Sequence, residues 1–118
     1  MVDIPHLDEE ALAELRDVME DEFSLLIETY LTDSKERIER LKEAMMKGDS
    51  DAFTKAAHSF KGSCINIGAT RLGELCQKAE TAGRNGDLNQ GSPVVDEIST
   101  EFQRVIEAFD TLMVRDVG

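Results

Sequence analysis

Residues 55–68 read Lys-Ala-Ala-His-Ser-Phe-Lys-Gly-Ser-Cys-Ile-Asn-Ile-Gly, and the rest of the chain is best understood outward from this stretch. Apolar residues recur through it at spacings of three and four, the pattern of an amphipathic helix; they are Phe53, Ala57, Phe60, Cys64 and Ile67. On a helical projection His58 lies roughly 150° from the middle of this stripe. We therefore expect a helix over about 51–67 that buries the stripe and presents His58 to solvent.

Similar apolar stripes occur on both sides of this helix. Asp8 is a suitable N-cap for a short helix that ends near Glu20, and a long helix is predicted over about 22–47, before Gly48. A fourth helix follows Gly68 almost at once and is expected to end at Gly83. So short a connection makes neighbouring helices antiparallel.

The last predicted helix follows a loop. Residues 83–91 are rich in Gly, Asn and Asp, which favours irregular structure. Ser92 can then cap a helix with Pro93 at its first position, where the missing N–H costs nothing, and the helix is expected to fray after Met113. We predict an all-α fold, an antiparallel up-down-up-down four-helix bundle with a short additional N-terminal helix, in a single domain over residues 1–118.

Charge and composition limit the classes of molecule that this chain is expected to bind. The chain has 25 acidic and 13 basic residues, a formal net charge of -12, so its average potential repels nucleic acid and anionic lipid. No stretch approaches the ~20 apolar residues of a membrane span, and the N-terminus lacks the pattern of a signal peptide. We expect a cytoplasmic protein that binds neither nucleic acid nor membrane and acts as a monomer, with Cys64 and Cys76 as reduced core side chains.

Metal and nucleotide chemistry are poorly supported. A di-iron bundle needs Glu-x-x-His pairs, and Lys55 stands three residues before His58. A zinc site would have to combine the two histidines with the two cysteines, but His6 lies in the N-terminal lead and both cysteines lie on apolar stripes. There is no phosphate-binding Gly-rich loop of the P-loop or kinase type. We expect no cofactor and no metal.

An exposed histidine can accept a phosphoryl group. Neutral imidazole is a good nucleophile near pH 7, and phosphoryl transfer chiefly needs positioning and nearby positive charge. Lys61 lies one turn from His58 and can supply that charge, with Lys55 on the preceding turn as a weaker second. Gly62 costs ~1 kcal/mol relative to Ala in a helix interior, which suggests that the space it leaves admits a partner.

Ile65 is an apolar residue on the same face as His58. Two explanations are open: Ile65 belongs to a surface on which a partner docks, or the short first helix folds over it. Thr54 and Lys55 are further candidates for docking.

The sequence Ala-His-Ser-Phe-Lys-Gly-Ser-Cys-Ile-Asn-Ile-Gly-Ala, from residue 57, resembles the histidine-containing phosphotransfer (HPt) domain. The core motif of that family is His-x-x-Lys-Gly-Ser/Ala, followed by a Gly at the end of the same helix. The resemblance implies a carrier that takes a phosphoryl group on His58 from the receiver domain of a hybrid sensor kinase and passes it to the aspartate of a response regulator. It also implies that Lys61 is the charge partner, that Gly62 gives clearance, and that the chain is not itself an enzyme.

One position departs from the family pattern. Some relatives hold the imidazole with a polar side chain of the next helix, often a glutamine, and the roughly matching residue here is Glu80. Glu80 or Gln77 could orient the His58 ring, although a carboxylate close to a phosphorylated histidine would be repulsive. The alternative function is a non-catalytic helical adaptor in which His58 is an ordinary surface residue.

Overall fold

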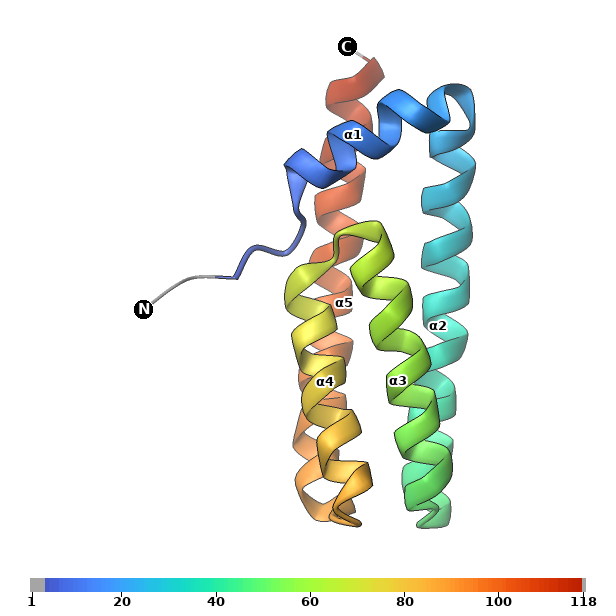
Figure 1. Ribbon diagram of the computed structural model, residues 1–118, viewed down its shortest axis with the longest axis vertical. Helices are drawn as coiled ribbons and strands as arrows, with labels where there is room; N and C mark the ends of the chain where they lie inside the picture. The colour runs from blue at the N-terminus through green and yellow to red at the C-terminus, as the bar shows by residue number, and fades with distance from the viewer. Residues whose placement is uncertain (1–3, 118) are drawn as a thin grey trace.

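The computed structural model describes residues 4–117, which form one short and four long helices. The short helix α1 spans Glu9–Met19 and a single 3-10 turn, Glu20–Glu22, joins it to α2. The long helices are α2 (Phe23–Lys47), α3 (Ser50–Ile67), α4 (Thr70–Arg84) and α5 (Leu88–Val117). They run up and down as an antiparallel bundle, and α1 crosses one end of it (Figure 1). The predicted fold class is confirmed.

Local sequence explains most of the helix boundaries. Asp8 caps α1 by accepting a hydrogen bond from the Ala11 amide at 3.1 Å, and Asp49 caps α3 in the same way through Ala52 at 3.0 Å. At the other end of α3, Gly68 has a φ of 80°, the left-handed conformation that ends a helix and that other residues adopt only with strain. The tight turn after it places α4 antiparallel to α3.

The predicted start of the last helix was wrong. Instead of a loop over 83–91, α4 continues to Arg84 and α5 begins at Leu88, so that Pro93 lies inside the helix. The side chain of Asp87 accepts a hydrogen bond from the Gln90 amide at 3.2 Å and caps the earlier start. The added turn is held by packing, because Gly91 is buried against Phe53. Local turn signals could not reveal that tertiary contact.

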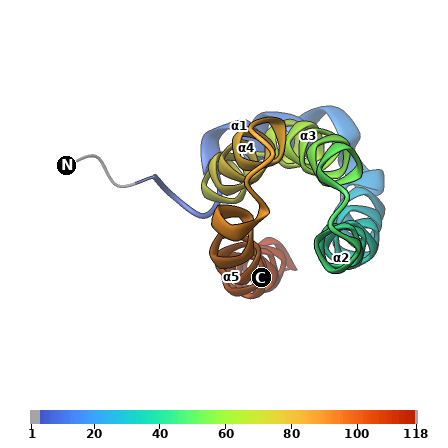
Figure 2. The same ribbon diagram turned by 90° about the horizontal axis from the view of Figure 1, so that it is seen from below.

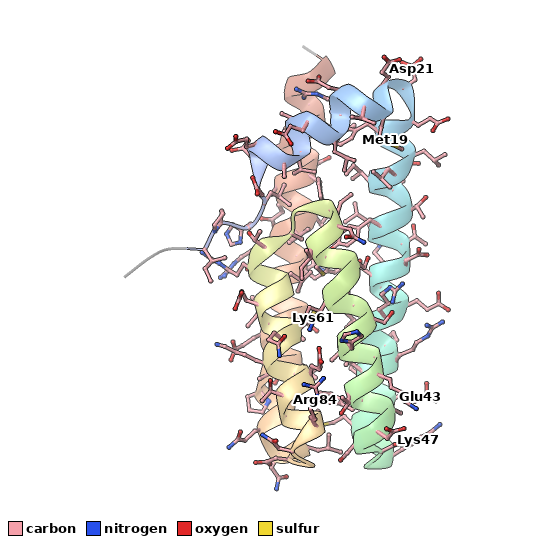
Figure 3. All side chains as sticks on the ribbon, in the orientation of Figure 1. Met19, Asp21, Glu43, Lys47, Lys61 and Arg84 are labelled. Carbon is pink, nitrogen blue, oxygen red and sulfur yellow. The ribbon has the colours of Figure 1, made fainter. Side chains whose placement is uncertain are left out.

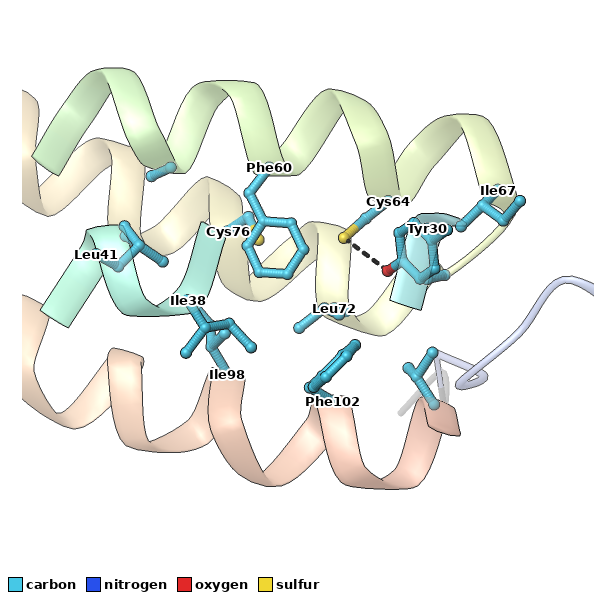
Figure 4. Packing of buried hydrophobic residues seen from close by; sticks show 14 of the residues in the cluster. Tyr30, Ile38, Leu41, Phe60, Cys64, Ile67, Leu72, Cys76, Ile98 and Phe102 are labelled. Atoms are coloured by element: carbon cyan, nitrogen blue, oxygen red, sulfur yellow. Dashed lines mark hydrogen bonds between the residues drawn. The ribbon is translucent and has the colours of Figure 1, made fainter. Parts of the chain in front are cut away.

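The core is built from the apolar stripes that the sequence predicts. The stripe of α3 is fully buried and contacts stripes from α2, α4 and α5 (Figure 4). Tyr30 reaches from α2 to α3, where its hydroxyl lies 3.2 Å from the sulfur of Cys64. A hydrogen bond with Cys64 and burial raise the pKa of Cys76, which keeps that side chain a thiol. Both cysteines are free and buried, as expected of small core residues.

The N-terminal segment is tied down over the turn between α3 and α4. The backbone oxygens of Ile4 and Pro5 accept hydrogen bonds from the side chains of Arg71 and Thr70, at 2.7 and 2.8 Å. His6 contacts the buried carboxylate of Glu101 on α5 at 2.6 Å. These contacts place α1 over the end of the bundle. Among the described residues, no helix is long and apolar enough to cross a membrane.

Helices α3 and α4 lie side by side along one side of the bundle, with α2 next to α3 and α5 next to α4 (Figure 2). They lie close together at Gly83, where an added Cβ would lie 3.1 Å from the Thr54 backbone nitrogen and nearer still to its side-chain oxygen. This approach sets the register along the pair, so that residue numbers rise on α3 as they fall on α4. The facing pairs are Thr54 with Gly83, His58 with Glu80, and Lys61 with Gln77.

Gly83→Ala should lower the free energy of unfolding by about 1–3 kcal/mol, because the new methyl group overlaps the side-chain oxygen of Thr54 and is crowded against its backbone nitrogen. Urea unfolding followed by circular dichroism measures the change. Gly62→Ala is the matched control: its Cβ would meet nothing within 4 Å, so stability should hold or rise by about 0.5–1 kcal/mol. Equal effects of the two substitutions would contradict the close contact.

Candidate functional site

His58 lies on the outward face of α3, with 67% of its side chain exposed. Ile65 shares this face and is 60% exposed, which rules out one of the two explanations that the sequence left open, cover by the short first helix. Helix α1 does not cover it; instead Asp8 and Leu12 pack over Gly68 at the end of α3. The face around His58 is therefore open, with an apolar residue two turns further along the helix.

Glu80 on α4 holds the imidazole ring. Its Oε1 lies 3.2 Å from Nδ1 of His58, while the Glu80 residue as a whole is only 1% exposed. An ionised carboxylate can only accept hydrogen bonds, so the pair assigns the ring proton to Nδ1. Nε2 then keeps its lone pair and is the nitrogen left without this contact. The arrangement leaves one nucleophilic nitrogen on an exposed ring of fixed orientation.

Lys61 contacts the same carboxylate rather than extending into solvent. Its ammonium group lies 2.8 Å from Oε1 of Glu80 and donates a hydrogen bond to Oε1 of Gln77 at 2.9 Å. Its side chain is 21% exposed. The cation is thus held between α3 and α4, one helical turn from His58.

The two candidates for orienting the ring have different contacts. Glu80 contacts His58, whereas Gln77 binds Lys61 through its carbonyl and donates to the Thr81 hydroxyl at 3.2 Å. The register of α3 and α4 explains the difference, because Gln77 lies opposite Lys61, one turn beyond the ring. Gln77 therefore positions the cation, and among the residues that the structure describes no hydrogen bond joins it to the imidazole.

Arg84 is a member of the site that the sequence reasoning missed. It forms an ion pair with Oε2 of Glu80, on the oxygen that Lys61 and His58 leave free. Figure 3 shows Lys61 and Arg84 between α3 and α4. The signal was present, since an Arg four residues after a Glu is a favourable helical pair, but the loop predicted from residue 83 hid it.

The contacts with Lys61 and His58 keep Glu80 ionised although it is buried. The hydrogen bond from Lys61 lowers its pKa most, burial opposes this, and the hydrogen bond with His58 lowers it further. A buried carboxylate needs such partners, because an isolated buried charge is costly. Glu80 is therefore a buried charge that its neighbours on α3 stabilise.

The remaining candidate residues surround His58 in different ways. Gly62 is exposed, and a Cβ built on it would meet nothing within 4 Å. Lys55 pairs with Asp51 at 3.0 Å on the surface. Thr54 is half-buried, donates to the Ser50 carbonyl at 2.7 Å and packs against Gly83, so it helps to set the helix contact. Within residues 4–117 no group of three or more His, Cys, Asp or Glu residues could hold a metal ion.

Comparison with known proteins agrees with this geometry. The Hpt domain family matches residues 25–108. Among solved structures, the chain is similar to histidine-containing phosphotransfer protein B (HptB) from Pseudomonas aeruginosa PAO1, with 38% identity, a TM-score of 0.91, and coverage of 96% of this chain and 98% of that one. No curated protein sequence matches the chain.

A second solved structure supports the fold at much lower identity. Histidine-containing phosphotransfer protein MtHPt2 from Medicago truncatula is 17% identical, with a TM-score of 0.82 and coverage of 96% of this chain and 84% of that one. At this identity the likeness concerns the fold alone. The bundle geometry is thus shared by proteins whose sequences have largely diverged.

Glu80→Gln should lower stability at pH 7, by an amount on the order of 1 kcal/mol, and the loss should shrink in acid. Because its folded-state pKa lies below the ordinary 4.5, ionised Glu80 stabilises the fold above that pH. The contribution disappears as pH falls through the lowered value. Urea unfolding of both proteins at pH 7 and in a series down to pH 3 tests this.

Glu43→Gln is a suitable control for the pH series, because Glu43 forms an exposed pair with Lys47 at 2.8 Å on α2. An exposed pair contributes little, so this substitution should change stability less at every pH. A destabilisation by Glu80→Gln that stayed constant or grew in acid would show that the carboxylate is not held ionised.

Proposed function

This chain belongs to the Hpt domain family and is a histidine phosphotransfer protein, and we propose that His58 is the residue that carries the phosphoryl group. The observation that carries the proposal is the contact between Nδ1 of His58 and the buried Glu80, at 3.2 Å. It leaves Nε2 of an exposed ring as the nucleophile. Family membership also implies that the partners are receiver domains of phosphorelay proteins.

The transfer needs no proton to move on this chain. Nε2 attacks the phosphorus of an aspartyl phosphate on the receiver; the N–P bond forms as the bond between phosphorus and the aspartate oxygen breaks, and the aspartate leaves as a carboxylate. The ring proton stays on Nδ1, and the ring becomes cationic. Its hydrogen bond to Glu80 then joins opposite charges, which strengthens it. The reverse reaction delivers the phosphoryl group to another receiver.

Lys61 supplies positive charge for the transferred group. Phosphoryl transfer spreads negative charge over three equatorial oxygens, which a nearby cation stabilises. Lys61 forms an ion pair with Glu80 and a hydrogen bond with Gln77. These contacts hold its ammonium group one turn from His58. A small displacement of its flexible side chain could bring it to the phosphoryl oxygens.

The exposed face of α3 receives the partner. Gly62 leaves the space beside His58 empty, Ile65 offers an exposed apolar contact, and Lys55 extends the surface by one turn in the other direction. We propose that phosphate flows from the receiver of a hybrid sensor kinase to His58 and then to the aspartate of a response regulator. The chain contributes half of the reacting site, and each receiver contributes the other half.

His58→Gln should abolish labelling when the protein is mixed with a receiver that carries radioactive aspartyl phosphate. The wild-type protein should acquire an acid-labile, alkali-stable phosphate, and circular dichroism should show an intact fold for the variant. Undiminished labelling of His58→Gln would exclude His58 as the acceptor. Binding of receivers without any transfer to the wild-type protein would favour the adaptor alternative.

Gly62→Gln should slow transfer by about tenfold or more, an effect of about 1.4 kcal/mol on the transition state, because the side chain fills the space beside His58. The rate of phosphoryl transfer is measured by quenching reactions with the same phosphorylated receiver at a series of times. Gly62→Ala adds only a methyl group and controls for the gain in helix propensity. A Gly62→Gln protein that transfers at the wild-type rate would show that the gap is not used.

A further inference from the structure

The buried Glu80 creates a problem that a neutral glutamine would not. Its carboxylate contacts Nδ1 at 3.2 Å and favours a cationic ring, but its negative charge also lies across that ring from the phosphoryl group on Nε2 and disfavours the negative charge that this group brings. In the unphosphorylated structure two cations neutralise it: Lys61 on Oε1 and Arg84 on Oε2. The cluster then has more positive than negative charge.

The two cations cannot have the same role once a phosphoryl group is present. Lys61 is on the same helix as His58 and one turn away, so it is the cation that can turn toward the phosphoryl oxygens. When it does so, it weakens its contact with Glu80. Arg84 lies on α4 with Glu80, four residues further on, and it binds the oxygen on the far side from the ring contact.

The surroundings of Arg84 favour a persistent pair with Glu80. Arginine stays charged at every physiological pH, and its guanidinium group suits a carboxylate. The preceding residue, Gly83, is packed against Thr54, which fixes the backbone from which the Arg84 side chain extends. The Arg84 side chain is 65% exposed whereas that of Glu80 is 2% exposed, so the arginine brings a solvated charge to a buried one.

We propose that Arg84 is a positioning residue of the phosphotransfer site, which neutralises Glu80 so that Lys61 is free to engage the phosphoryl group. This inference rests on the proposed function of His58. It explains how a carboxylate can orient the ring without repelling the group that the ring carries. It also makes Arg84 dispensable in a protein whose residue 80 is neutral.

A double-mutant cycle tests the inference. The variants are Arg84→Gln, Glu80→Gln and the double substitution, with Arg84→Lys as the conservative control. The main readout is the equilibrium ratio of phosphorylated protein to phosphorylated receiver. With Glu80 present, Arg84→Gln should lower this ratio by about tenfold, whereas Arg84→Lys should leave it close to the wild-type value. When residue 80 is glutamine, Arg84→Gln should change the ratio by less than about twofold.

Two results of the cycle would overturn the inference. An equal loss with Glu80 or Gln at position 80 would mean that Arg84 acts on the phosphoryl group directly. No loss in the presence of Glu80 would leave Arg84 as a favourable charge at the end of α4 and nothing more. Failure of the proposed function is distinct, since it requires that the wild-type protein stay unlabelled or that His58→Gln become labelled.

The contact between Arg84 and Glu80 can also be tested in the unphosphorylated protein, independently of phosphoryl transfer. NMR titration of the Glu80 side-chain carboxyl carbon should show a higher midpoint in Arg84→Gln than in the wild-type protein, because a neutralising cation has been removed. Glu43, which forms an exposed pair with Lys47 on α2, should titrate as before. An unchanged Glu80 midpoint would show that Arg84 does not neutralise the carboxylate, and would overturn the inference.

Discussion

The close packing of α3 on α4 is the constraint on which the site depends. At Gly83 the two helices lie so close that a methyl group would overlap the side-chain oxygen of Thr54 and crowd its backbone nitrogen. This contact fixes the register in which Glu80 lies opposite His58 and Gln77 lies opposite Lys61. A shift of one residue along either helix would turn these side chains away from one another, since neighbours on a helix differ by 100°. The geometry of the chemistry is therefore set by a packing contact away from the reacting nitrogen.

The two faces of α3 have different roles, one in the core and one in the site. The inner face of α3 carries a stripe that is buried against three other helices, which holds the helix still. Its outer face carries an exposed imidazole, an empty space at Gly62 and an exposed Ile65. Because rigidity comes from the inner face, the outer face needs few contacts of its own. It is free to meet a partner that completes the reacting site.

Between these faces lies a small charged layer centred on Glu80. Removing a carboxylate from water is costly, and the cost here is offset by an ammonium, a guanidinium and a ring N–H. The pKa of Glu80 is lowered chiefly by the hydrogen bond from Lys61 and further by the hydrogen bond with His58, against the opposing effect of burial. The same carboxylate thus orients the ring and binds two cations near it. A neutral glutamine at this position would attract those cations less strongly.

The sequence by itself determined the helical class, the buried stripes, the cap at Asp8, and the exposure of His58. Each of these follows from local periodicity or from a side chain bonding to its own helix end. Only the tertiary structure decided that Glu80 contacts the ring, that Gln77 contacts Lys61, and that Arg84 joins them. It also decided that α5 starts at Leu88, held by packing of Gly91 on Phe53. These features depend on the register between helices, which is fixed by contacts between residues far apart in the chain, and no local pattern encodes it.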